Sequence, residues 1–279
     1  MKILGFDFTS APDKRKPITV ATGTLNEGRL ELEGLESVES LEAFEHLLTT
    51  AGPWIAGMDF PFGQPRKLVA NLGWSQDWSG YVGEVANLGK AAFEKALTDY
   101  RNGRAKGDKQ HLRATDKLAG SCSPMMLAGV PVAKMFFVGA PRLLKSGVDI
   151  RPCRPKEQAG ATVVEAYPKL VAQKWIGAIP YKSDSKKKQQ AEHRDARQRI
   201  IKGLCSKYLR CLYGCDFLIS KECAESAVED PTGDRLDSIL CALQAAWAYE
   251  QRLSASFRYG IPTDCDSLEG WIVDPAQLL

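Results

Sequence analysis

The succession of apolar segments over residues 3–60 is the feature that most limits what this chain can fold into. Apolar and β-branched residues at 3–9 predict a strand, which Pro12 ends with a turn. Two more strands are predicted at 18–25 and 29–33, joined by a link of hairpin length. The first three strands are therefore expected to be antiparallel neighbours.

A helix and a fourth strand follow directly along the chain. Apolar residues recur at helical spacing over 41–48, after Ser40 as the N-cap and before the stop signal Gly52-Pro53. Residues 54–60 are almost continuously apolar, which is typical of a central strand buried on both faces and parallel to the first. The order β-β-β-α-β predicts an α/β fold.

The pattern is interrupted over residues 62–158, where only Val85–Arg101 has convincing helical periodicity. The most apolar window there, Ser123–Leu144, contains Lys134 and Arg142 as well as prolines, which excludes an uninterrupted membrane span. We expect this window to form a buried loop and helix. The whole segment is predicted to be a mostly helical insertion packed on the rest of the protein.

Regular patterns return after the insertion. A strand is predicted at 161–166, followed by an amphipathic helix around Ile200 and a last helix over 234–253. Residues 1–61 and 159–279 are therefore expected to form one core. That core would contain a mixed five-stranded sheet with helices on both faces.

Composition limits the class of protein more than its function. A chain of 279 residues with 44% apolar and 25% charged residues predicts one large domain or two intimate ones. The net charge is only +3, so affinity for a polyanion would have to come from a local patch. The first ten residues lack the features of a secretory signal, which predicts a cytoplasmic protein without a membrane anchor.

Two aspartates lie where neighbouring parallel strands are predicted to end. Asp7 and Asp59 each follow a largely apolar run, and a lone carboxylate there is unfavourable unless a cation or donors satisfy its charge. Adjacent strands lie about 4.8 Å apart, so both side chains can reach one site. Their mutual repulsion then requires a metal ion or a shifted proton.

Three further acids complete the candidate set. Asp234 and Asp237 are three residues apart at the start of the last helix, where the helix dipole favours negative charge. Glu165 ends the strand at 161–166. An all-oxygen group of this kind suits Mg²⁺ or Mn²⁺ and in-line displacement at a phosphodiester. Taken singly, each acid has a structural alternative, as a turn former, a helix-terminal charge or a partner of Lys169.

At these acids the sequence resembles a known family. The matching pieces are GFDFTSAP at 5–12, GMDFPFG at 57–63, LRATD at 112–116, VVEAYPKL at 163–170 and GDRLDSILCALQAAWAY at 233–249. They look like domain-of-unknown-function family 429, described as predicted nucleases of RNase H-like fold, and are more distantly similar to RuvC-type resolvases.

The resemblance implies a metal-dependent nuclease with catalytic acids Asp7, Asp59, Glu165, Asp234 and Asp237. All of these except Glu165 would bind Mg²⁺ or Mn²⁺, and DNA or RNA would be the partner. Substrate contacts are expected at Arg113, Asp116 and Lys169. The alternative for the first two is a buried Arg-Asp pair or helix cap that fixes the insertion to the core.

Other candidate groups have weaker signals. The densest basic stretch can bind phosphates or form a solvated helix face; it comprises Lys182, Lys186, Lys187, Lys188, Arg194, Arg197 and Arg199. Trp74, Trp78 and Tyr81 can stack bases, but are expected in a small core. The eight cysteines favour free thiols, and the group formed by Cys205, Cys211, Cys215 and Cys223 is expected to be buried small hydrophobes rather than a zinc site.

Two other classes of function stay open beside a nuclease. One is an ATP-using phosphotransferase of the actin and sugar-kinase type, which shares the β-β-β-α-β core. The other is a nucleic-acid-binding or regulatory module without catalysis. The sequence leaves the oligomeric state open.

Overall fold

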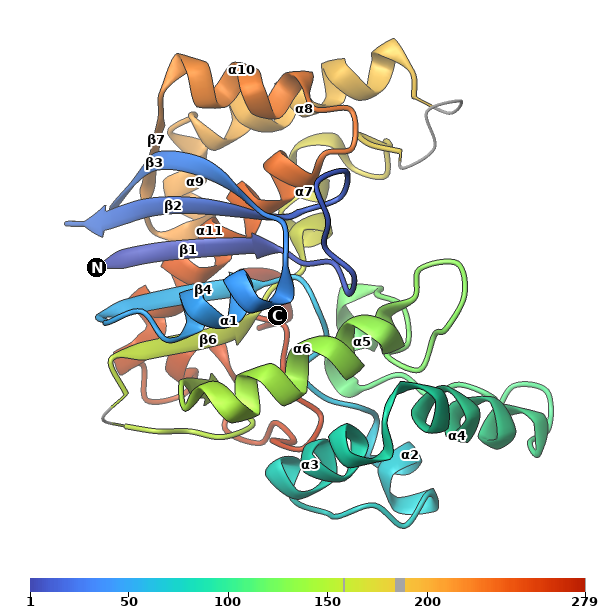
Figure 1. Ribbon diagram of the computed structural model, residues 1–279. Helices are drawn as coiled ribbons and strands as arrows, with labels where there is room; N and C mark the ends of the chain where they lie inside the picture. Colours follow the sequence, from blue (N-terminus) through green and yellow to red (C-terminus); the bar gives the residue numbers. More distant parts are fainter. Residues whose placement is uncertain (158, 184–188, 279) are drawn as a thin grey trace.

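The computed structural model describes residues 1–157, 159–183 and 189–278 and consists of one mixed sheet between two layers of helices (Figure 1). The sheet has seven strands in the order β5-β6-β4-β1-β2-β3-β7. Only β2 runs against the other strands, because β1 and β3 pair with it antiparallel and every other pairing is parallel. The fold is therefore α/β, as the sequence predicts.

The strand bounds follow the apolar segments. They are β1 (Lys2–Asp7), β2 (Ile18–Asn26), β3 (Arg29–Val38), β4 (Trp54–Met58), β5 (Asp149–Arg151), β6 (Ala161–Glu165) and β7 (Asp216–Ile219). The expected count of five strands is wrong, because β5 and β7 add an edge strand on each side. These strands have three and four residues, which is too short for a periodic pattern to show. Since β5 lies within 62–158, this part of the expected insertion belongs to the sheet.

Eleven α-helices are present in the described residues. They are α1 (Leu41–Leu48), α2 (Arg66–Asn71), α3 (Trp78–Leu88), α4 (Lys90–Asn102), α5 (Ala114–Ala119), α6 (Val132–Ser146), α7 (Pro168–Ile176), α8 (Ala191–Leu204), α9 (Tyr208–Tyr213), α10 (Lys221–Glu229) and α11 (Asp234–Glu250). The sequence predicts a single helix over Val85–Arg101, but in the structure these residues belong to two helices, α3 and α4. Gly89, with φ at 77° and ψ at 163°, separates them, because a residue with positive φ cannot continue a right-handed helix.

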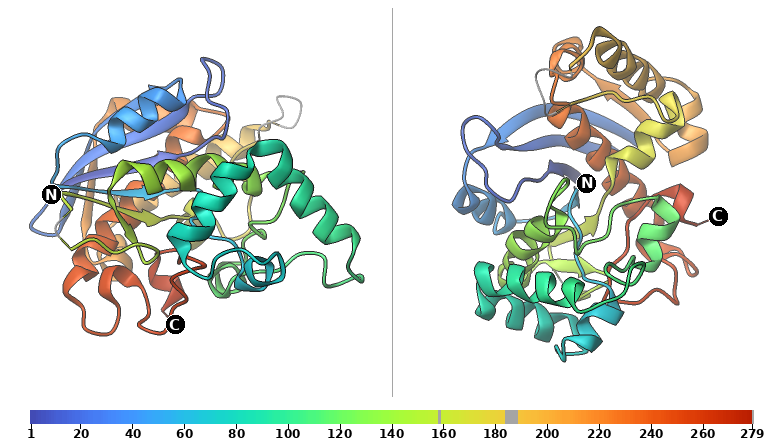
Figure 2. Two further views of the ribbon diagram at one scale, coloured as in Figure 1. Left: turned by 60° about the horizontal axis from the view of Figure 1, so that its bottom comes forward. Right: turned by 90° about the vertical axis from the view of Figure 1, so that its right-hand side faces the viewer.

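Each face of the sheet has its own apolar core. On one face, Ile3 and Ile55 pack with α11, α7 and α8. On the other, Phe6 and Met58 pack with α1, α3 and α6, as alternation along a strand requires. Trp78 and Tyr81 are 2% and 0% exposed in this second core, which confirms that they are core residues. Helices α2 to α6 extend beyond the end of β1, on the side where its arrow points (Figures 1 and 2).

Candidate metal centre

Three carboxylates from three different elements meet at the carboxyl ends of the central strands. Asp7 ends β1, Asp59 directly follows β4, and Asp237 lies in the first turn of α11. One carboxylate oxygen from each lies within 4.8 Å of the others. The backbone N–H of Asp59 donates to the carbonyl of Phe6 at 3.0 Å, which continues the pairing of the two strands. The structure thus brings together three of the five acids in the candidate set.

Two glycines explain how α11 comes close enough to deliver Asp237. Gly5 and Gly57 are paired across β1 and β4. A Cβ on Gly5 would lie 2.1 Å from the carbonyl oxygen of Ser238, and one on Gly57 would lie 2.3 Å from that of Cys241. Only glycine permits such close contact between a strand and a helix backbone.

The two strand aspartates lie on the same face of the sheet as these glycines, which is the face covered by α11. Asp7 and Asp59 each follow a paired glycine by two residues, so they share its face of the sheet. Asp237 precedes Cys241 by one helical turn and therefore lies on the helix side that faces the sheet. A Gly-x-Asp pattern on both strands, present at 5–7 and 57–59, is the sequence signal for this arrangement.

Ionisation of the two strand aspartates is disfavoured in the metal-free protein. Burial, with repulsion from the other acids, raises the pKa of Asp7 well above its ordinary value, although Lys182 opposes the shift. Burial and the neighbouring Asp237 raise the pKa of Asp59 to about 7. No group in the described residues donates a hydrogen bond to either carboxylate. Hard oxygen ligands in this state fit a divalent cation such as Mg²⁺ or Mn²⁺.

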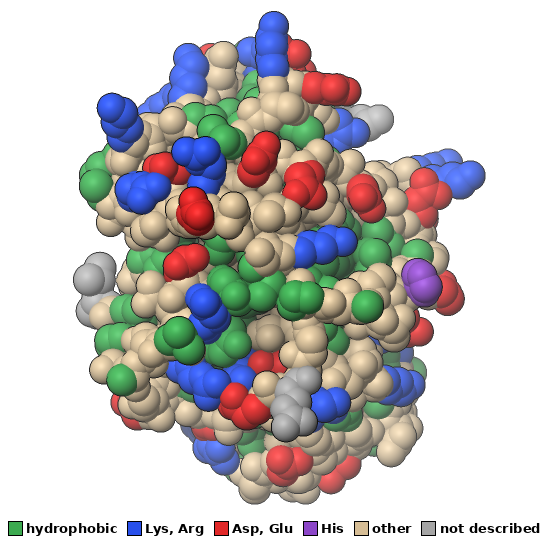
Figure 3. Space-filling model, turned by 90° about the vertical axis from the view of Figure 1, so that its left-hand side faces the viewer, with side chains coloured by type: hydrophobic (Ala, Val, Ile, Leu, Met, Phe, Trp, Pro, Cys, Tyr) green, Lys and Arg blue, Asp and Glu red, His purple; other side chains and the backbone are tan. Residues whose placement is uncertain are grey.

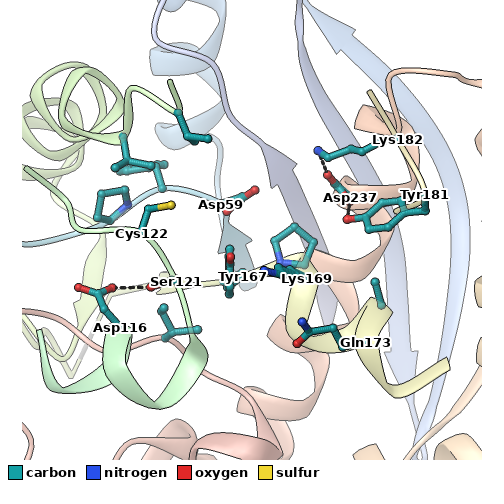
Figure 4. Close-up of a pocket in the computed structure, with 18 of the residues that line it drawn as sticks. Asp59, Asp116, Ser121, Cys122, Tyr167, Lys169, Gln173, Tyr181, Lys182 and Asp237 are labelled. Atoms are coloured by element: carbon teal, nitrogen blue, oxygen red, sulfur yellow. Dashed lines mark hydrogen bonds and ion pairs between the residues drawn. The ribbon is translucent and has the colours of Figure 1, made fainter. Parts of the chain in front are cut away.

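Asp237, by contrast, has two partners at the surface of a pocket (Figure 4). The Tyr181 hydroxyl donates to its Oδ1 at 2.6 Å, and the Lys182 ammonium forms an ion pair with its Oδ2. Burial alone would lower the pKa of Lys182, but Asp237 and Asp7 raise it well above its ordinary value. The tyrosine and lysine therefore hold Asp237 in place and partly neutralise the centre.

The sequence pattern does not single out this use of Lys182, which it places in a basic stretch. Arg197 of the same stretch is buried, and its guanidinium donates to the carbonyl oxygen of Tyr181 at 2.7 Å. Gly233 has φ at 77°, and a Cβ there would lie 2.8 Å from the Cβ of Lys182. Glycine thus lets the lysine stem cross the start of α11. The predicted basic residues at 186–188 lie outside the described residues.

Asp234 adjoins the centre without joining the group of three oxygens. It is the first residue of α11 and is half-buried. Burial and Asp237 raise its pKa, while Lys182 opposes this. In turn, Asp234 contributes to the raised pKa of Asp7. The charge of Asp234 therefore acts on the three-carboxylate group from the N-terminal end of α11.

Glu165 and the two predicted substrate residues in the insertion form a separate buried network. The Arg113 guanidinium donates to Glu165 at 2.8 and 2.5 Å, to Asp116 at 2.9 and 2.8 Å, and to the carbonyl of Glu269 at 2.9 Å. All five of its N–H donors are thereby used, which leaves none for a substrate. This is the geometry of a buried ion-pair network that fixes α5 to the end of β6.

A pocket of about 450 Å³ connects this network with Asp59 and Asp237 of the candidate metal centre. Asp237 and Lys182 lie at one end and Asp116 at the other, with Asp59 and Tyr167 between them (Figure 4). Lys169 is exposed on the wall formed by α7 and makes no ion pair within the described part of the chain. Most of the lining is apolar and a few polar groups converge on it, which is typical of a small-molecule site.

The four cysteines weighed as a zinc site, which are Cys205, Cys211, Cys215 and Cys223, do not line this pocket. All eight cysteines are free, with Cys205 and Cys211 exposed and Cys215 buried. The expectation of buried cysteines therefore fails for Cys205 and Cys211. On the face where β1 begins, basic and acidic side chains are intermingled (Figure 3). In the described ranges, none of the helices has the length and apolarity needed to cross a membrane.

The fold and the site define an α/β protein with a carboxylate cluster at the carboxyl ends of two central parallel strands. The family model described as "Protein of unknown function (DUF429)" matches residues 5–257. The chain therefore belongs to this family, and the match includes all five acids of the candidate set. Searches of curated proteins and of solved structures found no match.

Proposed function

We propose that the protein is a metal-dependent nuclease that hydrolyses phosphodiester bonds of DNA or RNA. The observation that carries the proposal is the convergence of Asp7, Asp59 and Asp237, with oxygens within 4.8 Å, beside a 450 Å³ pocket. A protein that used these residues only for stability would not place three acids together where two have raised pKa values and no donors.

The three aspartates would hold Mg²⁺ or Mn²⁺, with Asp234 next to them. Such a cation, when bound, supplies Lewis-acid polarisation of a phosphodiester oxygen. Lys182 and Tyr181 orient the Asp237 carboxylate through their two contacts. Asp59 and Asp237 face the pocket, so a substrate phosphate would be bound at its end.

We also propose that the five central strands form an RNase H-like core. Strands β3-β2-β1-β4-β6 include a single antiparallel member and follow the β-β-β-α-β order. Acids lie at the first strand, after the fourth, and at the start of a late helix. This is the arrangement behind the resemblance to RuvC-type resolvases. Strands β5 and β7 would then be additions at the edges.

Cleavage assays with single-stranded and double-stranded DNA and RNA test the proposal. We expect cleavage with Mg²⁺ or Mn²⁺, none with EDTA, and a loss of at least about 100-fold for Asp7→Asn, since several kcal/mol of transition-state stabilisation depend on the cation. Asp264→Asn is the matched control, because Asp264 is an exposed aspartate outside the centre.

Three other outcomes would end or replace the proposal. Absence of cleavage together with absence of carboxylate-dependent metal binding would end the nuclease assignment. Turnover of ATP under the same conditions would favour a phosphotransferase. Nucleic-acid binding that Asp7→Asn leaves unchanged, without cleavage by any metal-loaded form, would favour a binding module.

A further inference from the structure

The pocket beside the metal centre has the size of a small-molecule site rather than of a groove for a duplex. Its volume of about 450 Å³ lies within the range of pockets that enclose most of a small ligand. Its two walls come from the loop and start of α6, through Val130 and Met135, and from the segment after α7, through Ile179 and Pro180. A ligand held between these two walls would have one end next to Asp59 and Asp237.

The mouth of the pocket is apolar although it faces solvent. Val130 is 54% exposed and Ile179 is 45% exposed, and both line the pocket. Exposed apolar side chains that rim a concavity together are typical of a ligand-binding groove. Within the pocket, Tyr167 lies close to Asp59 and Lys169 (Figure 4), and an aromatic ring at this place can stack on a ligand.

Polar groups with unused hydrogen-bonding capacity complete the pocket. Gln173 and Lys169 are exposed on α7, and their side chains make no hydrogen bond or ion pair within the described residues. An amide offers both donors and acceptors to the edge of a heterocycle, and an ammonium offers donors to a phosphate. The pocket thus combines an apolar slot, a stacking ring and groups for a polar edge.

We infer that this pocket binds one unpaired nucleobase of the substrate, so that the adjoining phosphodiester lies at Asp59 and Asp237. The inference rests on the proposed nuclease function and specifies its substrate as a nucleotide whose base is unstacked. A base within a duplex cannot reach such a pocket without leaving the stack. Stacking on one aromatic ring tolerates any base, so selection would be for single-stranded structure rather than for sequence.

Binding measurements on matched oligonucleotides test the inference. Fluorescence anisotropy with Ca²⁺ present compares a thymidine 10-mer, a 10-mer of abasic residues and a 10-base-pair duplex, with intact oligonucleotide verified on gels. We expect the thymidine 10-mer to bind about tenfold more tightly than the abasic one, which is about 1.4 kcal/mol and in the range for stacking of one base. The duplex should bind like the abasic strand.

The double variant Val130→Gln/Ile179→Gln tests the pocket itself. Both positions are exposed, so the variant should fold, and it adds no charge. We expect it to weaken the thymidine 10-mer about tenfold and the abasic 10-mer less than twofold. Leu218→Gln is the matched control, since Leu218 on β7 is also 45% exposed and does not line the pocket.

The outcomes separate this inference from the proposed nuclease function. Equal binding of thymidine and abasic 10-mers, or equal effects of the double variant and its control, would overturn the base pocket even if the protein cleaves DNA. Base-dependent binding without cleavage would keep the pocket and reject the nuclease. If the dinucleotide TpT binds as tightly as the 10-mer, the pocket serves free short nucleotides instead of strands.

Discussion

Replacing Asp59 with asparagine should stabilise the metal-free protein while abolishing its response to metal. The substitution keeps the shape of the side chain and removes a half-buried charge that faces Asp7 and Asp237. An ordinary structural aspartate would show the opposite behaviour, because its removal would leave its partners without a hydrogen bond. The variant therefore distinguishes a metal ligand from a structural residue.

The magnitude follows from the pKa of Asp59, which is raised from 3.8 to about 7. Each pKa unit corresponds to about 1.4 kcal/mol, so full expression of the shift would lower the free energy of unfolding by about 4 kcal/mol. Asp59 is partly accessible to solvent, and we expect screening to reduce this to about 2 kcal/mol. For a domain of this size, that is a rise in Tm of about 4 °C for Asp59→Asn at pH 8.

The pH dependence has a definite sign. Because the pKa in the folded state is the higher one, the folded protein retains a proton that the unfolded chain releases between pH 4 and 7. The stability of the wild type therefore falls as pH rises through this window, and the penalty is complete above about pH 7. The advantage of Asp59→Asn should be largest at pH 8 and markedly smaller at pH 5.

Thermal unfolding at pH 5 and pH 8, with EDTA or Mn²⁺, measures all of these quantities. Mn²⁺ should raise the Tm of the wild type at pH 8, because at a concentration of 100 times its Kd it adds about 2.7 kcal/mol to the free energy of unfolding. It should leave the Tm of Asp59→Asn unchanged. Asp264→Asn, an exposed control, should behave as the wild type. A lower Tm for Asp59→Asn in EDTA at pH 8 would refute the view that this carboxylate is electrostatically unfavourable in the metal-free protein.

Three further variants test the surroundings of the centre. Gly57→Ala should lower stability by about 1–3 kcal/mol and weaken Mn²⁺ binding, whereas Gly34→Ala, whose Cβ would lie 3.5 Å from its nearest neighbour, should retain Mn²⁺ affinity in calorimetry. Arg113→Gln leaves the buried acids Glu165 and Asp116 without their guanidinium, so urea unfolding should show a loss of about 3–5 kcal/mol; a loss below 1 kcal/mol would contradict this. Lys182→Met removes an ammonium that would repel a cation bound at Asp237, so the Kd for Mn²⁺ should fall severalfold, and an unchanged Kd would count against that repulsion.

The part of the site that the sequence predicts is the part encoded by strand geometry. Asp7 and Asp59 each follow an apolar run, and parallel neighbours have fixed spacing, so their proximity follows from the order of elements. The start of α11 also follows from its periodicity, which places Asp234 and Asp237 at a helix N-terminus. The family match spans residues 5–257 and so includes all of these positions.

The parts that the sequence does not predict depend on contacts between distant residues. Glu165 ends a strand just as Asp7 does, yet it is paired with Arg113, which lies 52 positions away. Lys182 reaches Asp237 over 55 positions, and no local pattern separates it from the other lysines of its stretch. A strand-end acid can therefore be recognised from sequence, but whether its charge is already paired is a tertiary property.

Close packing of α11 is what makes an otherwise unfavourable cluster of acids persist. Ile239, Leu240 and Leu243 are fully buried on this helix, and burial of three such side chains stabilises the fold by about 5–9 kcal/mol. This exceeds the penalty of about 4 kcal/mol for the full Asp59 shift, so the helix can hold Asp237 against the two strand aspartates without a cation. Gly5 and Gly57 set how close that approach is. Affinity for a metal should therefore change with helix-to-sheet distance even where every carboxylate is retained, which a site built on a mobile loop would not show.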